Sequence, residues 1–513
     1  MITRSQIIVR GIVQGVGFRP YVYSRANRRA LRGRVLNDAS GVVIDVEGSP
    51  SDIEEFILEL SSNPPPLSAI ESIECNTNLD LAHFGEFRIV ESRSHGPKFV
   101  PLSADIATCD DCLGELFDPA NRRYRYPFIN CTNCGPRFSI IEDIPYDRSR
   151  TTMRDFAMCA ECEAEYRNPF DRRYHAEPIA CADCGPTLSL LDADANNITT
   201  ENSITTIQLL LREGRIVAIK GIGGFHLACD ASNREAVERL RQRKYREDKP
   251  FALMATSVEV VRKYCLVSEA EANMLHSEAR PIVLVRKKTD MNLALAVAPV
   301  ARRLGFMLPY SPLHHLLLQE FEEPLVFTSG NISDEPICYQ NDEALQRLRN
   351  IADYFLVHDR RIHLRTDDSV TRVSAAGETL VRRSRGYAPA PVKLEQTFKR
   401  HILACGAELK NTFCLARDNY AFVSHHIGDL ENLETLKSFT AGIDHFKRLF
   451  YLEPQVIAYD LHPEYLSTKY ALGLDDNLQK IGVQHHHAHI ASCLADNGVD
   501  KDVIGVAFDG LGF

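Results

Sequence analysis

The sequence has no run of 20 apolar residues, the length that a membrane-spanning helix requires, so a membrane protein is not expected. It also has no excess of positive charge. The formal net charge of −10 argues against broad binding to nucleic acids. No secretory signal peptide is recognised, and seven of the 15 cysteines lie outside CxxC pairs, so a reducing cytoplasm is the expected location.

The first 34 residues contain no Asp or Glu but eight Arg, a composition that superficially resembles a transit peptide. The pattern within them differs, because Ile7–Val13 alternates like a strand and Gln14–Phe18 is spaced by glycines. These features predict a folded anion site. A length of 513 residues with 44% hydrophobic residues predicts about three or four domains with real cores.

Eight cysteines form four CxxC pairs in two tandem copies, and every cysteine of the second copy lies 50 positions after its counterpart. The duplication extends to Pro119 with Pro169, to an Arg-Arg-Tyr triplet and to a Gly-Pro pair. The cysteines are Cys109, Cys112, Cys131 and Cys134 in the first copy and Cys159, Cys162, Cys181 and Cys184 in the second.

Two residues between cysteines allow one tight turn to direct both thiolates to one ion, and four soft ligands suit tetrahedral Zn²⁺. A disulfide framework is the alternative, but it suits small secreted domains better than a 513-residue chain. We therefore predict two structural zinc ions in a domain at 105–190. Each copy closes on itself or the copies exchange pairs, and the spacing leaves both arrangements open.

Residues 1–91 predict a ferredoxin-like α+β domain in the order strand, helix, hairpin, helix, strand. The glycine loop before a helix presents backbone N–H groups and a positive dipole end to a phosphate, and Arg19 begins that helix. A Ser51/Glu54 capping box is expected for the second helix. The segment from Gly11 to Arg19, together with Asn37, resembles the acylphosphatase signature. The resemblance implies that Arg19 binds phosphate and that Asn37 positions the attacking water.

Residues 200–391 alternate helical patterns with apolar runs and predict an α/β domain. Lys244 and Arg246, expected in an extended segment, would point to the same side and hold a triphosphate. With Ser329 and Asn331 they resemble the KxR and SxN pairs of the YrdC family, which implies ATP binding at these four residues. Roles for His226 and Asp230 stay open. The residues Arg382, Arg383 and Arg385 either close over the nucleotide or face solvent.

Residues 400–513 predict the first part of another nucleotide-binding fold, with Lys410 after a strand and a glycine. His485 and His489 lie one helical turn apart and can face one metal ion, although a histidine-rich helix cap would look the same. The segment resembles TsaD-type ASKHA domains. The resemblance implies a metal at His485 and His489, with Asp509 as a further ligand or phosphate-loop residue.

Acylphosphatase-like, double zinc-ribbon-like, YrdC-like and partial TsaD-like modules in this order resemble the HypF carbamoyltransferases along the whole chain. The resemblance implies that carbamoyl phosphate is hydrolysed near Arg19 and that carbamate reacts with MgATP near Lys244 to give carbamoyl-AMP. It also implies transfer of the carbamoyl group at the histidine site to the C-terminal cysteine of the partner HypE, for cyanide ligands of nickel–iron hydrogenase.

The last domain of that family normally continues well beyond Gly512, so a truncated second lobe and an impaired transfer step are expected. Two other functions are weighed. A threonylcarbamoyl-AMP synthase for tRNA modification shares the KxR and SxN pairs but has no need of an acylphosphatase domain. A non-enzymatic zinc-ribbon adaptor for RNA or protein is poorly supported by the negative charge and by two anion sites.

Overall fold

The computed structural model describes residues 1–513 except 1, 15, 39–40, 66, 91–101, 290–291, 334, 376, 511 and 513. Gly15 of the predicted phosphate loop and Ala39 and Ser40 of the predicted hairpin turn lie outside the described residues. The chain divides into two compact units. The first comprises Met1–Thr187, Tyr310–Leu316 and His358–His363, and the second comprises Leu188–Pro309, Leu317–Val357 and Leu364–Phe513.

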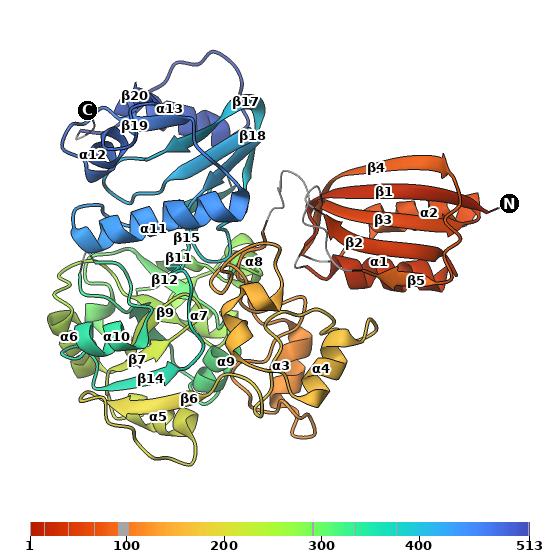
Figure 1. The fold of residues 1–513 in the computed structure, drawn as a ribbon. Coiled ribbons are helices and arrows are strands. Elements are labelled where there is room, and N and C mark those ends of the chain that lie inside the picture. Colours follow the sequence, from red (N-terminus) through yellow and green to blue (C-terminus); the bar gives the residue numbers. More distant parts are fainter. Residues whose placement is uncertain are drawn as a thin grey trace. The chain divides into compact units, whose positions relative to one another are not determined.

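The first unit begins with a five-stranded sheet in the order β4-β1-β3-β2-β5 (Figure 1). Strand β1 pairs antiparallel with β3 and β4, β2 pairs antiparallel with β3, and β5 is parallel to β2. Every second residue of β1 is buried, and Ile7 and Val9 share one core with Val22 of α1 and Phe56 of α2. This confirms the predicted ferredoxin-like arrangement. The elements are β1 (Thr3–Ile12), α1 (Phe18–Arg28), β2 (Arg32–Asp38), β3 (Gly41–Gly48), α2 (Pro50–Ser62), β4 (Ala69–Leu79) and β5 (Phe87–Ile89).

The capping box predicted at Ser51 and Glu54 is wrong, because helix α2 begins at Pro50. Ser49 is the cap, and its hydroxyl oxygen accepts a hydrogen bond from the Asp52 backbone N–H at 3.2 Å. Proline suits the first helical position because its ring fixes φ and it has no N–H to leave unpaired.

The rest of the first unit contains little regular structure. Each cysteine copy contributes one short helix that begins directly after its first cysteine, so that Cys109 and Cys159 are the N-caps. One apolar cluster here holds only four fully buried residues, two of which are cysteines. The elements are α3 (Asp110–Phe117), η1 (Arg148–Arg150), η2 (Thr152–Asp155) and α4 (Ala160–Arg167). Most of α9 (Pro312–Leu318) also belongs to this unit.

The second unit contains a large mixed sheet in the order β16-β15-β11-β12-β9-β13-β8-β7-β14-β6, with β10 paired to β11. Its central strands are apolar and buried, as in β7 and β8. The elements are β6 (Leu188–Asp192), α5 (Ser203–Arg212), β7 (Val217–Lys220), β8 (Phe225–Asp230), α6 (Arg234–Arg243), β9 (Ala252–Met254), α7 (Val258–Tyr264), β10 (Cys265–Leu266), α8 (Glu269–His276), β11 (Ile282–Lys287), η3 (Leu295–Val297), β12 (Arg303–Met307), β13 (Leu325–Ser329), α10 (Asn341–Arg347), β14 (Tyr354–His358), β15 (Val370–Ser374) and β16 (Gly377–Arg382).

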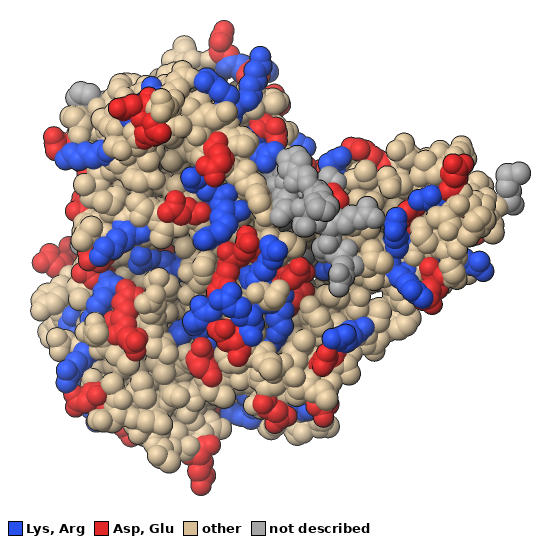
Figure 2. All heavy atoms as spheres, viewed as in Figure 1, with Lys and Arg blue, Asp and Glu red and all other residues tan. Residues whose placement is uncertain are grey.

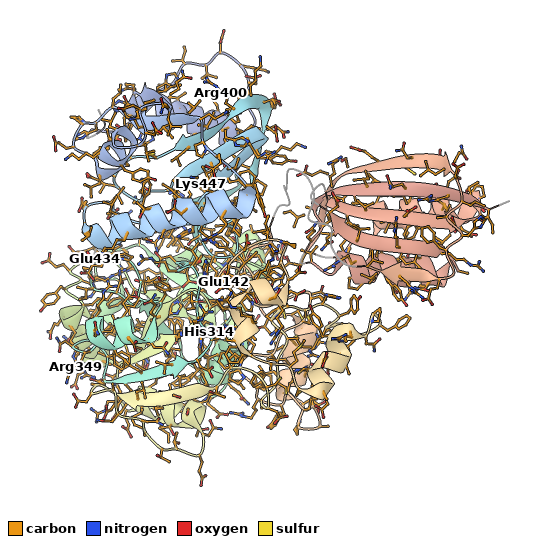
Figure 3. All side chains as sticks on the ribbon, viewed as in Figure 1. Glu142, His314, Arg349, Arg400, Glu434 and Lys447 are labelled. Carbon is orange, nitrogen blue, oxygen red and sulfur yellow. The ribbon has the colours of Figure 1, made fainter. Side chains whose placement is uncertain are left out.

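A four-stranded sheet in the order β18-β17-β19-β20 completes the second unit. In the same part of the chain, helix α11 has Glu434 in its first turn and Lys447 in its last turn, and these charges complement the helix dipole (Figure 3). The elements are β17 (Val392–Ala404), β18 (Cys414–Val423), α11 (Leu433–Phe450), β19 (Val456–Asp460), α12 (Leu466–Leu472), β20 (Gln479–Val483) and α13 (His485–Asp496).

Among the described residues, no helix combines the length and the apolar character that crossing a membrane would require. On the face shown in Figure 2, basic and acidic side chains are interspersed. Such a mixture provides no broad field of one sign on that face for binding nucleic acid.

Candidate active sites and metal centres

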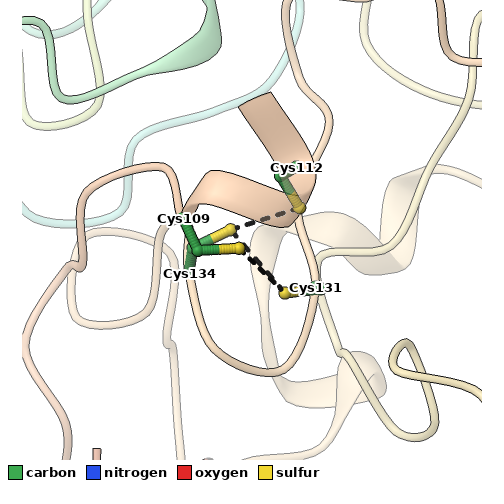
Figure 4. A group of neighbouring side chains, drawn as sticks. All are labelled: Cys109, Cys112, Cys131 and Cys134. Atoms are coloured by element: carbon green, nitrogen blue, oxygen red, sulfur yellow. Dashed lines mark hydrogen bonds between the residues drawn. The ribbon is translucent and has the colours of Figure 1, made fainter. Parts of the chain in front are cut away.

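Each cysteine copy closes on itself. In the first copy the Sγ–Sγ distances are 3.6 Å for Cys109 to Cys131, 3.5 Å for Cys112 to Cys134 and 3.9 Å for Cys131 to Cys134 (Figure 4). The corresponding distances in the second copy are 3.7, 3.6 and 3.7 Å. A tetrahedron with Zn–S bonds of about 2.3 Å has edges of roughly 3.8 Å, so both tetrads fit a zinc ion. The question of pairing, which the spacing leaves open, is thus answered by the geometry.

The two copies are joined by a reciprocal exchange of arginines. Arg122 of the first copy donates a hydrogen bond to Cys162 Sγ of the second at 3.1 Å, and Arg172 of the second donates to Cys112 Sγ of the first at 3.2 Å. The same arginines pair with Glu165 and Glu115 on the opposite helices. The sequence shows the duplicated arginines but not this crossing, because only the fold brings residues 40 and 60 positions apart together.

Burial would raise the pKa of Glu165, but the guanidinium groups of Arg123 and Arg122 hold that pKa at about 2. Arg123 also donates to the Ala180 carbonyl oxygen at 2.9 Å, and its counterpart Arg173 donates to the Asn130 carbonyl oxygen at 3.1 Å. The two arginines of each copy therefore pair with the glutamate on the helix of the other copy. Each tetrad depends on side chains that the other copy supplies.

Arg19 and Asn37 line one small cavity in the first unit. Arg19 lies in the first turn of α1, which begins after Gly17 in the left-handed region at φ 73°, a conformation that favours glycine. Asn37 is buried near the end of β2, and its Oδ1 atom has no hydrogen-bond partner among the described residues. An unpaired acceptor beside a buried arginine suits an incoming water and a phosphate.

The four residues predicted to bind ATP lie together on a second cavity, in the second unit, of about 470 Å³. Lys244 is buried, and its Nζ donates to the Ser329 and Asn331 carbonyl oxygens, both at 2.6 Å, and to Asn331 Oδ1. Burial and the neighbouring Arg246 lower the pKa of Lys244 well below its ordinary value. Because all three ammonium donors have protein acceptors, contact with a phosphate requires that one of these bonds be exchanged.

The prediction that Lys244 and Arg246 lie in an extended segment is wrong. Lys244 is the C-cap of α6, and Tyr245 adopts the left-handed region at φ 53°. This turn exposes the Tyr245 side chain and leaves both basic residues on the cavity wall. The two side chains thus reach one site through a helix terminus and not through strand alternation.

Of the residues whose roles the sequence leaves open, His226 and Arg382 line this cavity and Asp230 does not. His226 lines the cavity, and its Nε2 lies 2.9 Å from Asp368 Oδ2; the other oxygen of this carboxylate, Oδ1, accepts a hydrogen bond from Arg385 Nε at 2.8 Å. Asp230 instead accepts hydrogen bonds from Ser232 in a turn. Arg382 lines the cavity.

Arg383 and Arg385 neither line this cavity nor face solvent. Both donate to backbone carbonyl oxygens inside the fold, Arg383 to that of Val423 and Arg385 to that of Ala279. Sequence reasoning did not identify Asp367 and Asp368, two adjacent carboxylates on the cavity wall. Burial raises the pKa of Asp367, whereas for Asp368 the effect of burial is outweighed by Arg385 and His226, which lower its pKa.

The wall of the same cavity continues onto the last domain. Lys410, His426 and Asp429 line it, and the Lys410 backbone N–H donates to Asp429 Oδ1 at 2.7 Å. Burial, together with Arg382, lowers the pKa of His426 to about 3. The imidazole is therefore neutral at neutral pH, and the cavity joins the predicted ATP residues to a neutral histidine of the adjoining domain.

The histidine site gathers His485, His489 and Asp509. Asp509 Oδ2 lies 3.0 Å from His485 Nε2 and 3.1 Å from His489 Nε2. The other ring nitrogen of His485 lies 2.6 Å from Asp460 Oδ2, a contact that fixes the orientation of the ring. Two imidazole nitrogens and a carboxylate form a donor set that suits a divalent metal ion. Asp460 was missed, although its position at the end of a buried strand was a usable signal.

Four family models match the chain. The acylphosphatase model matches residues 5–89, the HypF finger model matches 108–141 and 158–191, the model described as telomere recombination matches 209–384, and the HypF Kae1-like domain model matches 397–496. Together these matches support the predicted fold class.

Relatives resemble the chain over its whole length. The carbamoyltransferase HypF of Synechocystis is 47% identical, with 100% of this chain and 67% of the relative covered. A probable carbamoyltransferase HypF of Methanocaldococcus jannaschii is 44% identical, with 99% and 67% covered. A crystal structure of full-length HypF in a phosphate- and nucleotide-bound form has 52% identity and a TM-score of 0.96, with 100% and 67% covered. The chain spans about two thirds of the length of these relatives.

Proposed function

Because the chain belongs to the HypF carbamoyltransferase family, we propose that it converts carbamoyl phosphate and ATP into carbamoyl-AMP and passes the carbamoyl group to the C-terminal cysteine of HypE. The group would become a cyanide ligand during nickel–iron hydrogenase maturation. The observation that carries this proposal is the 470 Å³ cavity, whose wall combines the ATP-binding candidates with Lys410 and His426 of the last domain. Its volume lies within the range of roughly 300–1,000 Å³ typical of ligand sites.

The first step would take place at Arg19. The guanidinium fork and the N-terminus of α1 bind the phosphoryl oxygens of carbamoyl phosphate. The unpaired Asn37 Oδ1 accepts a hydrogen bond from water and orients it. Water adds to phosphorus, the bond from phosphorus to the acyl oxygen breaks, and inorganic phosphate and carbamate leave.

The second step would take place in the larger cavity. Arg246, Ser329 and Lys244 bind the phosphates of ATP, and Mg²⁺ would reduce the charge repulsion between them. A carbamate oxygen attacks the α-phosphorus, the bond to the bridging oxygen breaks, and pyrophosphate leaves with carbamoyl-AMP as product. Carbamate decomposes in water, so a single chain that carries both steps limits its loss.

The third step would use the last domain. The cysteine thiolate of HypE attacks the carbamoyl carbon, and AMP leaves. The thiol would lose its proton to solvent before the attack, because His426 on the cavity wall, with its pKa lowered to about 3, is too weak a base to accept that proton at neutral pH. A divalent ion held by His485, His489 and Asp509 would supply charge neutralisation for the nucleotide. Zinc in the two cysteine tetrads would stabilise the fold.

An ATP–pyrophosphate exchange assay tests the proposal. Exchange is expected with carbamoyl phosphate and not with threonine and bicarbonate, the substrates of a threonylcarbamoyl-AMP synthase. Lys244→Ala should reduce the exchange about 100-fold or more while phosphate release from carbamoyl phosphate continues. Lys263→Ala, which alters an exposed lysine on α7, is the matched control. Exchange that depends on threonine would contradict the assignment.

Arg19→Ala tests whether the two anion sites are separable. It should abolish phosphate release from carbamoyl phosphate but leave ATP binding intact, because the residues lie on separate domains and should behave additively. ATP binding is measured by calorimetry in the same preparation. Loss of both activities in a folded Arg19→Ala variant would indicate one shared site instead.

A further inference from the structure

The cavity around Arg19 is not built by the acylphosphatase-like domain alone. Its wall also includes Thr132 of the first cysteine copy and Tyr174, His175 and Glu177 of the second. All these residues belong to the first unit. A Cβ atom added at Gly17, at the start of the Arg19 helix, would lie 3.3 Å from Thr132 Oγ1, so the phosphate loop and the cysteine module are in close contact.

Tyr174 is the best placed of these residues to limit the substrate. Its side chain is buried, with 6% of its surface exposed. Burial raises the pKa of Tyr174, and the positive charge of Arg19 opposes that rise, which places the phenol within electrostatic reach of the guanidinium. The Tyr174 ring centroid lies 4.5 Å from that of His175, which in turn lies 4.7 Å from that of Tyr166. The His175 ring therefore lies between the Tyr174 and Tyr166 rings, and because Tyr174 is buried, its ring cannot move aside without repacking.

The duplication supplies an internal comparison. His175 has φ 51° and its counterpart Arg125 has φ 55°, so both copies build the same left-handed turn. In the first copy this turn does not line the Arg19 cavity, and Tyr124, the counterpart of Tyr174, is 44% exposed. The backbone is thus a shared structural feature, whereas the aromatic wall at the cavity is particular to the second copy.

We propose that Tyr174 and His175 of the second cysteine copy determine acyl specificity, by closing the Arg19 pocket to all but the smallest acyl phosphates. The cavity volume is about 20 Å³, close to that of one or two water molecules. The carbamoyl group has three heavy atoms, so it would require less rearrangement of the cavity wall than a larger acyl group. An aryl group would have to displace a buried ring. This inference rests on the proposed acyl phosphate hydrolysis and adds the zinc-binding module to its substrate site.

The test measures phosphate release from carbamoyl phosphate and from benzoyl phosphate by the full chain. The wild type should prefer carbamoyl phosphate. Tyr174→Ala should raise the benzoyl-to-carbamoyl ratio of kcat/KM by about tenfold or more, mainly through a lower KM for benzoyl phosphate. Tyr174→Phe keeps the ring and should keep the wild-type ratio. Tyr124→Ala, the matched substitution in the first copy, should leave the ratio unchanged.

His175→Gly is a second test variant, which keeps the proposal testable if Tyr174→Ala does not fold. Glycine suits the left-handed turn, so this substitution removes the ring and relieves backbone strain at once. It should shift the ratio in the same direction, with the bound zinc unchanged by elemental analysis. Equal use of both substrates by the wild type, or an unchanged ratio in both variants, would overturn the proposal. A wild type that releases phosphate from neither substrate would instead refute the proposed hydrolysis itself.

Discussion

Replacing Arg172 by alanine is expected to weaken metal binding in the first cysteine copy and not in the copy to which Arg172 belongs. The reason is the crossed contact, in which Arg172 Nη1 lies 3.2 Å from Cys112 Sγ and Nε lies 3.0 Å from Glu115 Oε1. Without the guanidinium, the charge of the thiolate cluster and of Glu115 is less well neutralised.

The size of the effect follows from the chemistry of the contact. A hydrogen bond to a charged group contributes about 1.5–3 kcal/mol. The Arg172 side chain is 26% exposed, so screening by solvent reduces this to about 1–2 kcal/mol. At about 1.4 kcal/mol per factor of ten, metal affinity in the first copy should fall roughly 5- to 30-fold.

Chelator competition combined with thiol alkylation measures this loss copy by copy. In Arg172→Ala, mass spectrometry should show Cys109 and Cys112 alkylated before Cys159 and Cys162. The reciprocal variant, Arg122→Ala, should reverse that order. Alkylation of the second copy first in Arg172→Ala would refute the crossed arrangement.

Arg167→Ala is the matched control for this experiment. Arg167 lies on α4, the helix that begins directly after Cys159, but it is 75% exposed, and within the described part of the chain its ion pair is with Glu163 on its own helix. Such a pair contributes about 0.5 kcal/mol or less, so the order and rate of alkylation should match the wild type.

Three further predictions concern single positions. Cys131→Ser should disrupt folding and not one catalytic constant, because a lost structural ligand removes folding free energy; zinc content and thermal unfolding check this. Asp460→Asn should weaken Co²⁺ binding at His485 by about 10- to 100-fold in equilibrium dialysis, because the partner that lies 2.6 Å from the ring loses its negative charge. The pKa of His426, lowered to about 3 from an ordinary value near 6.5, makes the unfolded state bind more protons between these values. Stability should therefore fall as pH decreases from about 6.5 towards 3, and His426→Gln should flatten this slope in melting curves; an unchanged slope would contradict the assignment.

The elements that depend on local pattern could be predicted from the sequence. The strand, glycine loop and helix that present Arg19 follow from alternation and glycine spacing within a short segment. The duplicated CxxC pairs likewise predict four-sulfur sites, because two intervening residues allow one tight turn to direct both thiolates to the same ion. Where the prediction failed, at Ser51 and at Tyr245, a neighbouring residue changed the local backbone, through Pro50 in one case and a left-handed turn in the other.

The features that depend on distant contacts could not be predicted. Asp368 meets His226 across 142 positions, and Asp460 meets His485 across 25. Nothing in the sequence around Asp368 distinguishes it from a surface acid; the position of Asp460 at the end of a strand marks that acid as a candidate but does not identify His485 as its partner. The crossing of Arg122 and Arg172 is of the same kind, because a duplicated triplet is compatible both with contacts inside each copy and with contacts between copies.

The crossing also suggests how the second cysteine copy, whose apolar cluster is small, can form a wall of the proposed hydrolysis pocket. The apolar cluster around the second tetrad holds only four fully buried residues, so it contributes little rigidity by hydrophobic burial alone. Metal ligation would fix each copy, and the exchanged arginines join the two copies. Tyr174 and His175 lie one and two residues after Arg173, whose guanidinium is anchored in the first copy. We therefore expect the position of the aromatic wall at the Arg19 cavity to depend on metal in both tetrads. Partial removal of zinc should relax the acyl preference before it abolishes hydrolysis, which a chelator titration with carbamoyl and benzoyl phosphate would show. Simultaneous loss of both activities would mean that the wall and the phosphate site unfold together.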